Sequence, residues 1–176
     1  MATLLAVYAN RAHRRARFEA RIEAMGGNVY YAKDDAFFRM RTAEPSLLHR
    51  LLGDDIEAAY IAVTNDDQLA VFDDCPEIQR IDVAGRVSDK GVARLSRLRN
   101  LKSLSLKSNL ISIRGLEALA AINGLRQLHV MDNGFTDQAA VERLLASMPQ
   151  CQVVFGVFED LTAEQMADDD ETDASP

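Results

Sequence analysis

The 176-residue sequence predicts an α/β solenoid, with parallel strands on its concave side, helices on its convex side, and about five repeats behind an N-terminal cap of helix and strand. Three segments with the pattern apolar-x-x-apolar-x-apolar begin at Ile78, Leu101 and Leu125, which are 23 and 24 residues apart. Between them runs a second pattern, in which apolar residues recur at helical spacing. Because one such unit cannot bury both its strand face and its helix face, stacked neighbours must complete the core.

Residues 1–57 are expected to form a basic helix and a cap on the first repeat. Phe18, Ile22 and Met25 recur at helical spacing within residues 4–25. The other elements expected here are a helix stop at Gly26-Gly27, a strand at 28–32 and a short helix at 46–52. A cap of this kind is needed because an uncapped solenoid exposes its apolar end.

The solenoid itself is expected to fill residues 58–158. Two weaker copies flank the three strong strand segments. In AAYIAV, Ile61 and Val63 occupy the inward positions after Ala58, and in CQVVFG the same pattern is carried by Cys151 and Val154. Five turns of the repeat result.

A helix is expected after each of the strong strands. Ser88, Ser112 and Thr136 stand where such a helix needs an N-cap. Asp89 and Asp137 follow, where the helix dipole favours an anion. The buried helical face is predicted to consist of Val92, Leu95, Leu98, Leu116, Leu119 and Ile122.

The segments VSDKGVARLSRL and ISIRGLEALAAI resemble the V-T-D-x-G-L-x-x-L-x-x-L helix of short bacterial leucine-rich-repeat proteins. The resemblance extends outward to GGNVYY, LLHRLLGDD and MPQCQVVF and covers about residues 11–155. It implies a leucine-rich-repeat fold and a binding module of the kind that many such proteins form, membrane-anchored or secreted. The anchor helix that such proteins often place before their basic segment is lacking here.

Residues 159–176 are expected to form a largely disordered acidic tail. This segment carries eight acidic residues and no Lys or Arg, so it accounts for the net charge of −7, and the rest of the chain is close to neutral. With only two cysteines and no apolar run of about 20 residues, the chain is expected to be cytoplasmic.

No motif predicts an active site, a metal site or a cofactor. The three histidines, His13, His49 and His129, lie in different predicted elements, and none belongs to an HExxH or triad pattern. Cys75 and Cys151 lack CxxC spacing and are predicted to be buried core thiols. The absence of Trp and the 6% aromatic content disfavour recognition of sugars or bases by stacking.

The N-terminal helix carries a basic face formed by Arg14, Arg17 and Arg21. Such a face can contact anionic lipid or, less expectedly here, nucleic acid. Because Glu19 and Glu23 interrupt the run, the favoured interpretation is a solvated helix face with intrahelical ion pairs.

The strand residues that alternate with the core define the expected binding surface, because this face of a solenoid is the usual one for partners. Its predicted contact residues are Tyr60, Arg80, Asp82, Ser105, Lys107, Gln127, His129 and Phe155. The apolar C-terminal edge around Phe155 is expected either to meet a partner or, preferably, to be covered by residues 161–166. We therefore expect a non-catalytic module that binds a protein or peptide, with a peripheral membrane protein as the alternative.

Overall fold

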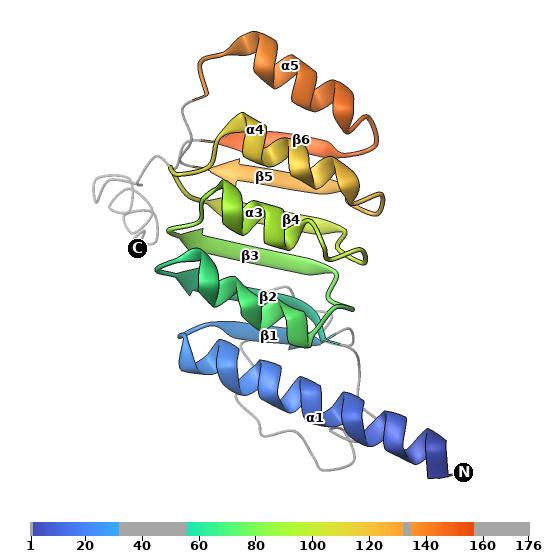
Figure 1. Ribbon diagram of the computed structural model, residues 1–176. Helices are drawn as coiled ribbons and strands as arrows, with labels where there is room; N and C mark the ends of the chain where they lie inside the picture. Colours follow the sequence, from blue (N-terminus) through green and yellow to red (C-terminus); the bar gives the residue numbers. More distant parts are fainter. Residues whose placement is uncertain (1, 32–55, 132–134, 157–176) are drawn as a thin grey trace, which may run out of the picture.

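The computed structural model describes residues 2–31, 56–131 and 135–156, with side chains from residue 9 onward in the first range. These residues form an open six-stranded sheet in the order β1-β2-β3-β4-β5-β6, so strands adjacent in sequence are adjacent in space. β1 runs antiparallel to β2, and all later pairs are parallel. The helices stack on one face of this sheet (Figure 1). An α/β fold with a mainly parallel sheet is thereby confirmed.

The N-terminal helix α1 spans Ala2–Ala24 and ends as the sequence predicts. Gly26 adopts a φ of 74°, a left-handed conformation that favours glycine, and its N–H bonds to the carbonyl of Glu23. Phe18 and Ile22 are fully buried, and the Phe18 ring lies 5.9 Å from that of Phe72. The helix therefore packs on η1 through Phe18, at the β1 end of the sheet.

The predicted strand after α1 is confirmed as β1, Asn28–Tyr31, which pairs with β2, Ile56–Val63. The short helix predicted at 46–52 and the acidic tail at 159–176 lie outside the described residues.

The remaining strands are β3 (Arg80–Gly85), β4 (Ser103–Lys107), β5 (Gln127–Met131) and β6 (Gln152–Gly156). Ile81, Leu104 and Leu128 lie side by side across β3, β4 and β5, as the spacing of the three strong segments predicts. At the N-terminal end the register differs by two residues, because Ala59 and not Ile61 pairs with Ile81. Side chains alternate with a period of two, so this shift leaves every β2 residue on its predicted face.

Short helices connect the parallel strands, and two of them begin at a predicted cap. They are η1, a 3₁₀ helix at Asp66–Asp74, α3 at Asp89–Leu95, α4 at Ile113–Leu116, η2, a 3₁₀ helix at Glu117–Ala121, and α5 at Gln138–Ser147. Ser88 and Ser112 cap α3 and α4 through their side chains. The third prediction was wrong by one residue, because Asp137 and not Thr136 caps α5 by accepting from the N–H of Ala140.

Carboxylates link consecutive helix starts to one another. Asp66 accepts hydrogen bonds from the backbone N–H and the hydroxyl of Ser88, and Asp89 does the same for Ser112 at 2.7 and 2.6 Å. The aspartate at the first position of one helix therefore holds the N-cap of the next helix.

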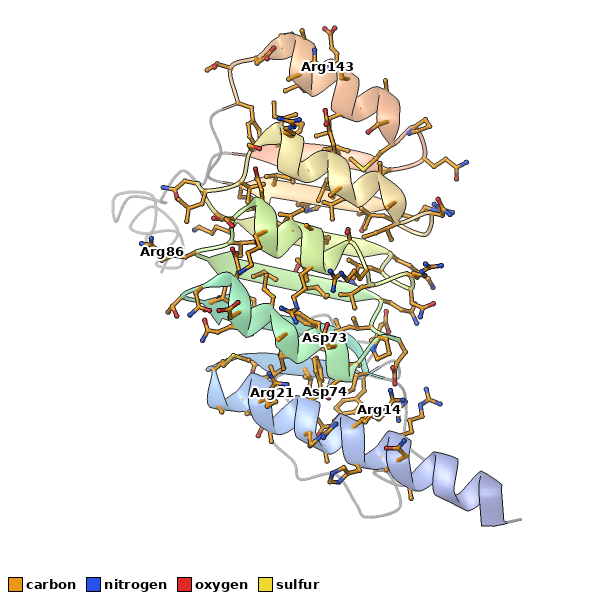
Figure 2. All side chains as sticks on the ribbon, in the orientation of Figure 1. Arg14, Arg21, Asp73, Asp74, Arg86 and Arg143 are labelled. Carbon is orange, nitrogen blue, oxygen red and sulfur yellow. The ribbon has the colours of Figure 1, made fainter. Side chains whose placement is uncertain are left out.

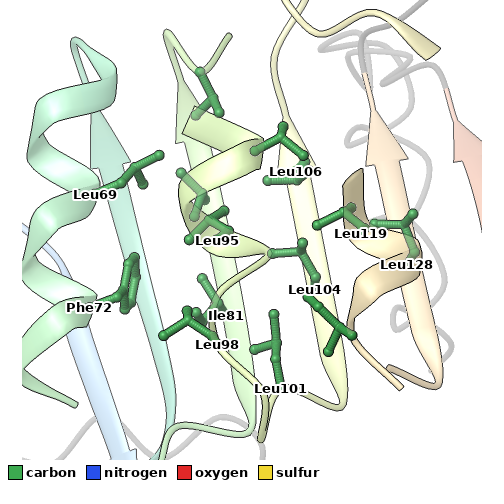
Figure 3. Close-up of a cluster of buried hydrophobic side chains, with 14 of the residues drawn as sticks. Leu69, Phe72, Ile81, Leu95, Leu98, Leu101, Leu104, Leu106, Leu119 and Leu128 are labelled. Atoms are coloured by element: carbon green, nitrogen blue, oxygen red, sulfur yellow. The ribbon is translucent and has the colours of Figure 1, made fainter. Parts of the chain in front are cut away.

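The core lies between the sheet and the helices (Figure 3). Leu104, in the middle of β4, is 1% exposed and is flanked by strands on both sides. Leu95, Leu101, Leu119 and their neighbours close the layer from the helical side.

Candidate interaction surface

The strand side chains that point away from the helices form a surface that we call the open face. Within β3, β4 and β5 its members alternate strictly with buried core residues. Across β2 to β6 the open face consists of Tyr60, Ala62, Arg80, Asp82, Ala84, Ser103, Ser105, Lys107, Gln127, His129, Met131, Gln152 and Val154. Seven of the eight residues predicted for the binding surface lie on it.

Two rows of side chains cross the open face at right angles to the strands. One row is Tyr60, Asp82, Ser105, His129 and Val154, in which each residue is the register partner of the next. Adjacent parallel strands lie about 4.8 Å apart, so the four steps of this row span about 19 Å. A single partner surface can contact all five residues at once.

The second row holds Arg80, Ser103, Gln127 and Gln152 in consecutive strands. The Arg80 guanidinium pairs with the carboxylate of Glu57 at 3.4 Å. Sequence reasoning missed Glu57, because it assigned this residue to the cap and began the repeats at residue 58. Glu57 places a carboxylate beside the arginine at this edge of the surface.

Phe155 does not belong to the open face, which corrects one predicted contact residue. In β6 it is Val153 that pairs with Leu128, one residue before the predicted Val154. A shift by one residue turns every side chain of a strand to the other face. Phe155 accordingly packs against the core, edge to face with Phe135 at 5.5 Å, and Val154 replaces it on the open face with 41% exposure.

Asp82 is a partly buried carboxyl group in the middle of the open face. Burial raises the pKa of its carboxyl above the ordinary value of 3.8, although the charges of Arg80 and His129 act to lower it. Among the described residues, none forms a side-chain hydrogen bond with Asp82. The free energy lost when the carboxyl group leaves water is therefore not offset in this way. The carboxylate is thus held partly desolvated between a cation and an imidazole.

Two arginines of the predicted basic face of α1 form ion pairs with η1. Arg17 and Arg21 both bind the carboxylate of Asp74, at 3.0 and 2.9 Å, and Figure 2 shows the Arg21 and Asp74 side chains between α1 and η1. The Nε atom of Arg14 is buried and has no hydrogen-bond partner. Arg17 and Arg21 therefore help to hold α1 against η1, where sequence reasoning expected intrahelical ion pairs or surface contact.

The two cysteines differ in their surroundings. Cys75 is fully buried, as predicted, whereas Cys151 is half-buried and stands before β6, outside the leading core position expected for it. Burial raises the pKa of the Cys151 thiol, and the nearby charge of Arg126 opposes this effect.

Within the described ranges, no group of three or more His, Cys, Asp or Glu side chains is placed to hold a metal ion. None of the helices described here combines the length and the apolar character needed to cross a membrane. A scan against protein-family models finds no match for this chain, and a search of curated proteins finds none either.

Proposed function

We propose that this chain is a solenoid of the leucine-rich-repeat type that acts as a non-catalytic interaction module, binding a protein or peptide across the open face. The strand-helix units repeat at 23 and 24 residues, and their helix starts share one cap and one carboxylate link. Such repetition is what a stacked solenoid requires.

The observation that carries the binding proposal is the environment of Asp82. Ionising a half-buried carboxyl group that accepts no side-chain hydrogen bond from the described residues costs folding free energy. If position 82 had no function, a neutral side chain would avoid this cost. Residues that lower stability in this way are typical of functional surfaces.

The chemistry of the two rows favours a protein or peptide over other ligands. Arg80 and Asp82 supply charges of both signs, Ser105 supplies a hydroxyl group and Gln127 an amide. Tyr60, which is 38% exposed, adds an aromatic ring. Mixed groups of this kind orient a polypeptide, whereas nucleic acid and anionic lipid favour a surface of one positive sign. Two of the three α1 arginines on which the membrane alternative rests, Arg17 and Arg21, are engaged by Asp74.

A pair of photocrosslinking variants tests the proposal. One variant carries a photoreactive residue at Gln127, which is exposed on the open face, and the other carries it at Arg143, which is exposed on α5 on the helical side. In extract from the native source, the Gln127 variant is expected to capture one polypeptide that the Arg143 variant does not. Capture at Arg143 alone would place the partner on the helices and refute the proposal.

A further inference from the structure

Four cations gather at the end of the sheet where the parallel strands begin. Arg97, Arg99 and Lys102 lie in the turn before β4, Arg126 lies in the turn before β5, and all four are exposed. The two turns are in direct contact, because the N–H of Arg126 donates to the carbonyl of Lys102 at 2.8 Å. We call this set the basic rim.

The basic rim has no counter-charge among the described residues. None of its four members forms an ion pair there, and Arg126 only donates to the carbonyls of Asn123 and Leu125. Glu77, in the turn before β3, is already engaged by Arg11 and Arg15. On the other side, the turn at residues 148–151 carries no charge. Four unpaired cations in two adjacent turns attract an anionic segment.

A pocket of about 340 Å³ opens beside the rim, between η2 and the end of α5. Ile122, Leu125 and Met148 supply its apolar lining, and Cys151 lies in its wall. Arg126 acts electrostatically on the Cys151 thiol, so the pocket and the rim are adjacent. Together they suit a segment that places an apolar side chain next to several carboxylates.

We propose that this site takes the C-terminal segment of the chain itself, with the Met166 side chain in the pocket and residues 168–171 on the basic rim. The sequence EQMADDDE has the required order, an unbranched apolar side chain followed by four consecutive acidic residues. The four acidic side chains of residues 168–171 are opposite in charge to the four cations of the rim and equal to them in number.

The length of the chain after β6 allows this contact. β6 ends at Gly156, on the side of the sheet opposite the rim, so the chain must return along a strand of five residues, a distance of about 17 Å. Met166 is the tenth residue after Gly156, and ten extended residues reach about 33 Å. Met166 therefore reaches the pocket with slack, and Asp168 to Glu171 follow toward Arg126 and Arg99.

Cys151 supplies the measurement, because it lies in the pocket wall and the other cysteine, Cys75, is fully buried. The rate of Cys151 alkylation by iodoacetamide is measured on the full chain. It is extrapolated to complete ionisation of the thiol, so that differences in the thiol pKa between variants do not affect the comparison of rates. The wild-type rate is compared with that of a tail variant carrying Asp168→Asn, Asp169→Asn, Asp170→Asn and Glu171→Gln. The two chains have equal length and the same repeats.

At about 20 mM salt the tail variant is expected to react about fourfold faster than wild type. This follows from an effective concentration of about 1 mM for a flexibly linked segment that binds with a Kd of about 0.3 mM. At about 500 mM salt the difference should fall below about 1.5-fold, because screening weakens exposed charge pairs. Equal rates at low salt would overturn the proposal. A protection that grows with protein concentration would also overturn it, because a second copy would then supply the tail.

A charge exchange gives the matched control. Arg99→Glu with Lys102→Glu should raise the alkylation rate to that of the tail variant, and adding Asp169→Lys with Asp170→Lys should restore the slow rate. Failure of the exchange to restore protection would mean that the tail does not contact the rim.

Discussion

At the scale of single residues, the sequence motif at the start of α3 and α4 has a physical explanation. Ser112 caps α4, and the Asp89 carboxylate of the preceding helix holds Ser112 by two hydrogen bonds. A Cβ added at Gly115 would lie only 2.1 Å from the Asp89 Oδ1 atom, so this position must be glycine. In the next repeat Ile113 replaces the aspartate and Ala139 replaces the glycine. The aspartate and the glycine thus occur together and are lost together.

This coupling predicts the outcome of a double-mutant cycle. Gly115→Ala should lower the free energy of unfolding by about 1–3 kcal/mol, because displacing the Asp89 carboxylate outweighs the better helix propensity of alanine. When Asp89 is first changed to Gly, the same substitution should lie within about 0.5 kcal/mol of neutral. Denaturant unfolding of the four proteins measures both values. Equal costs in the two backgrounds would mean that the carboxylate does not occupy this space.

A second residue-scale prediction concerns Asp82. Its folded-state pKa is raised above 3.8 by burial, so its stabilising contribution is full below that pH and is lost as the pH rises through the folded-state pKa. Asp82→Asn should therefore be more stable than wild type at pH 7, with a higher Tm. The advantage should shrink as the pH falls toward 3.8. Melting curves between pH 3.5 and 7 check this, and a variant less stable than wild type at pH 7 would show that the carboxylate is well paired.

At the scale of the element, the strands in the middle of the sheet were predictable and those at its ends were less so. The 23- and 24-residue spacing of the strong segments fixes how β3, β4 and β5 pair. β6 does not follow this spacing, because Val153 comes 25 residues after its register partner Leu128. The helix between β5 and β6 is also longer, with 10 residues against 7 in α3. The pattern in CQVVFG fits either register, so the sequence could not decide which face Phe155 takes.

The central strand is tested by a pair of neighbouring substitutions. Leu104→Ala should cost about 2–5 kcal/mol of unfolding free energy, because flanking strands on both sides prevent the cavity from collapsing. Ser105→Ala, on the open face, should be close to neutral. Thermal melts of both variants distinguish the faces, and an unchanged Tm for Leu104→Ala would contradict the register of β4.

The corrected register of β6 can be tested in the same way. Phe155→Ala should cost about 1–3 kcal/mol, because the ring packs on Phe135 and the core. Val154→Ala should change stability by less than about 0.5 kcal/mol, because Val154 is 41% exposed. Chemical denaturation ranks the two, and the reverse order would restore the sequence-based register with Phe155 on the open face.

At the scale of the whole molecule, a repeat pattern predicts a surface more readily than a partner. Alternation in the strands was enough to locate Arg80, Asp82, Ser105, Lys107, Gln127 and His129 on one face. Alternation could not predict ion pairs between residues far apart in the sequence. Nothing local in the sequence marks Asp74 as the partner of Arg17 and Arg21, or Glu57 as that of Arg80. The basic rim was not predicted from the sequence for the same reason. Its members come from two separate turns, and they lie together only because these turns are in contact in the fold.

The central claim is that a partner binds across the open face, and the affinity of the captured polypeptide for two charge-reversed proteins tests it most directly. Arg80→Glu with Asp82→Lys keeps the net charge but inverts the middle of the surface, whereas Arg14→Glu with Arg17→Glu changes the α1 cap. The first variant is expected to weaken binding at least about tenfold, a loss of about 1.4 kcal/mol, while its Tm shows that it remains folded. The second should bind as wild type does. If the α1 variant loses the partner and the Arg80/Asp82 variant keeps it, the partner binds the N-terminal cap and the claim is wrong.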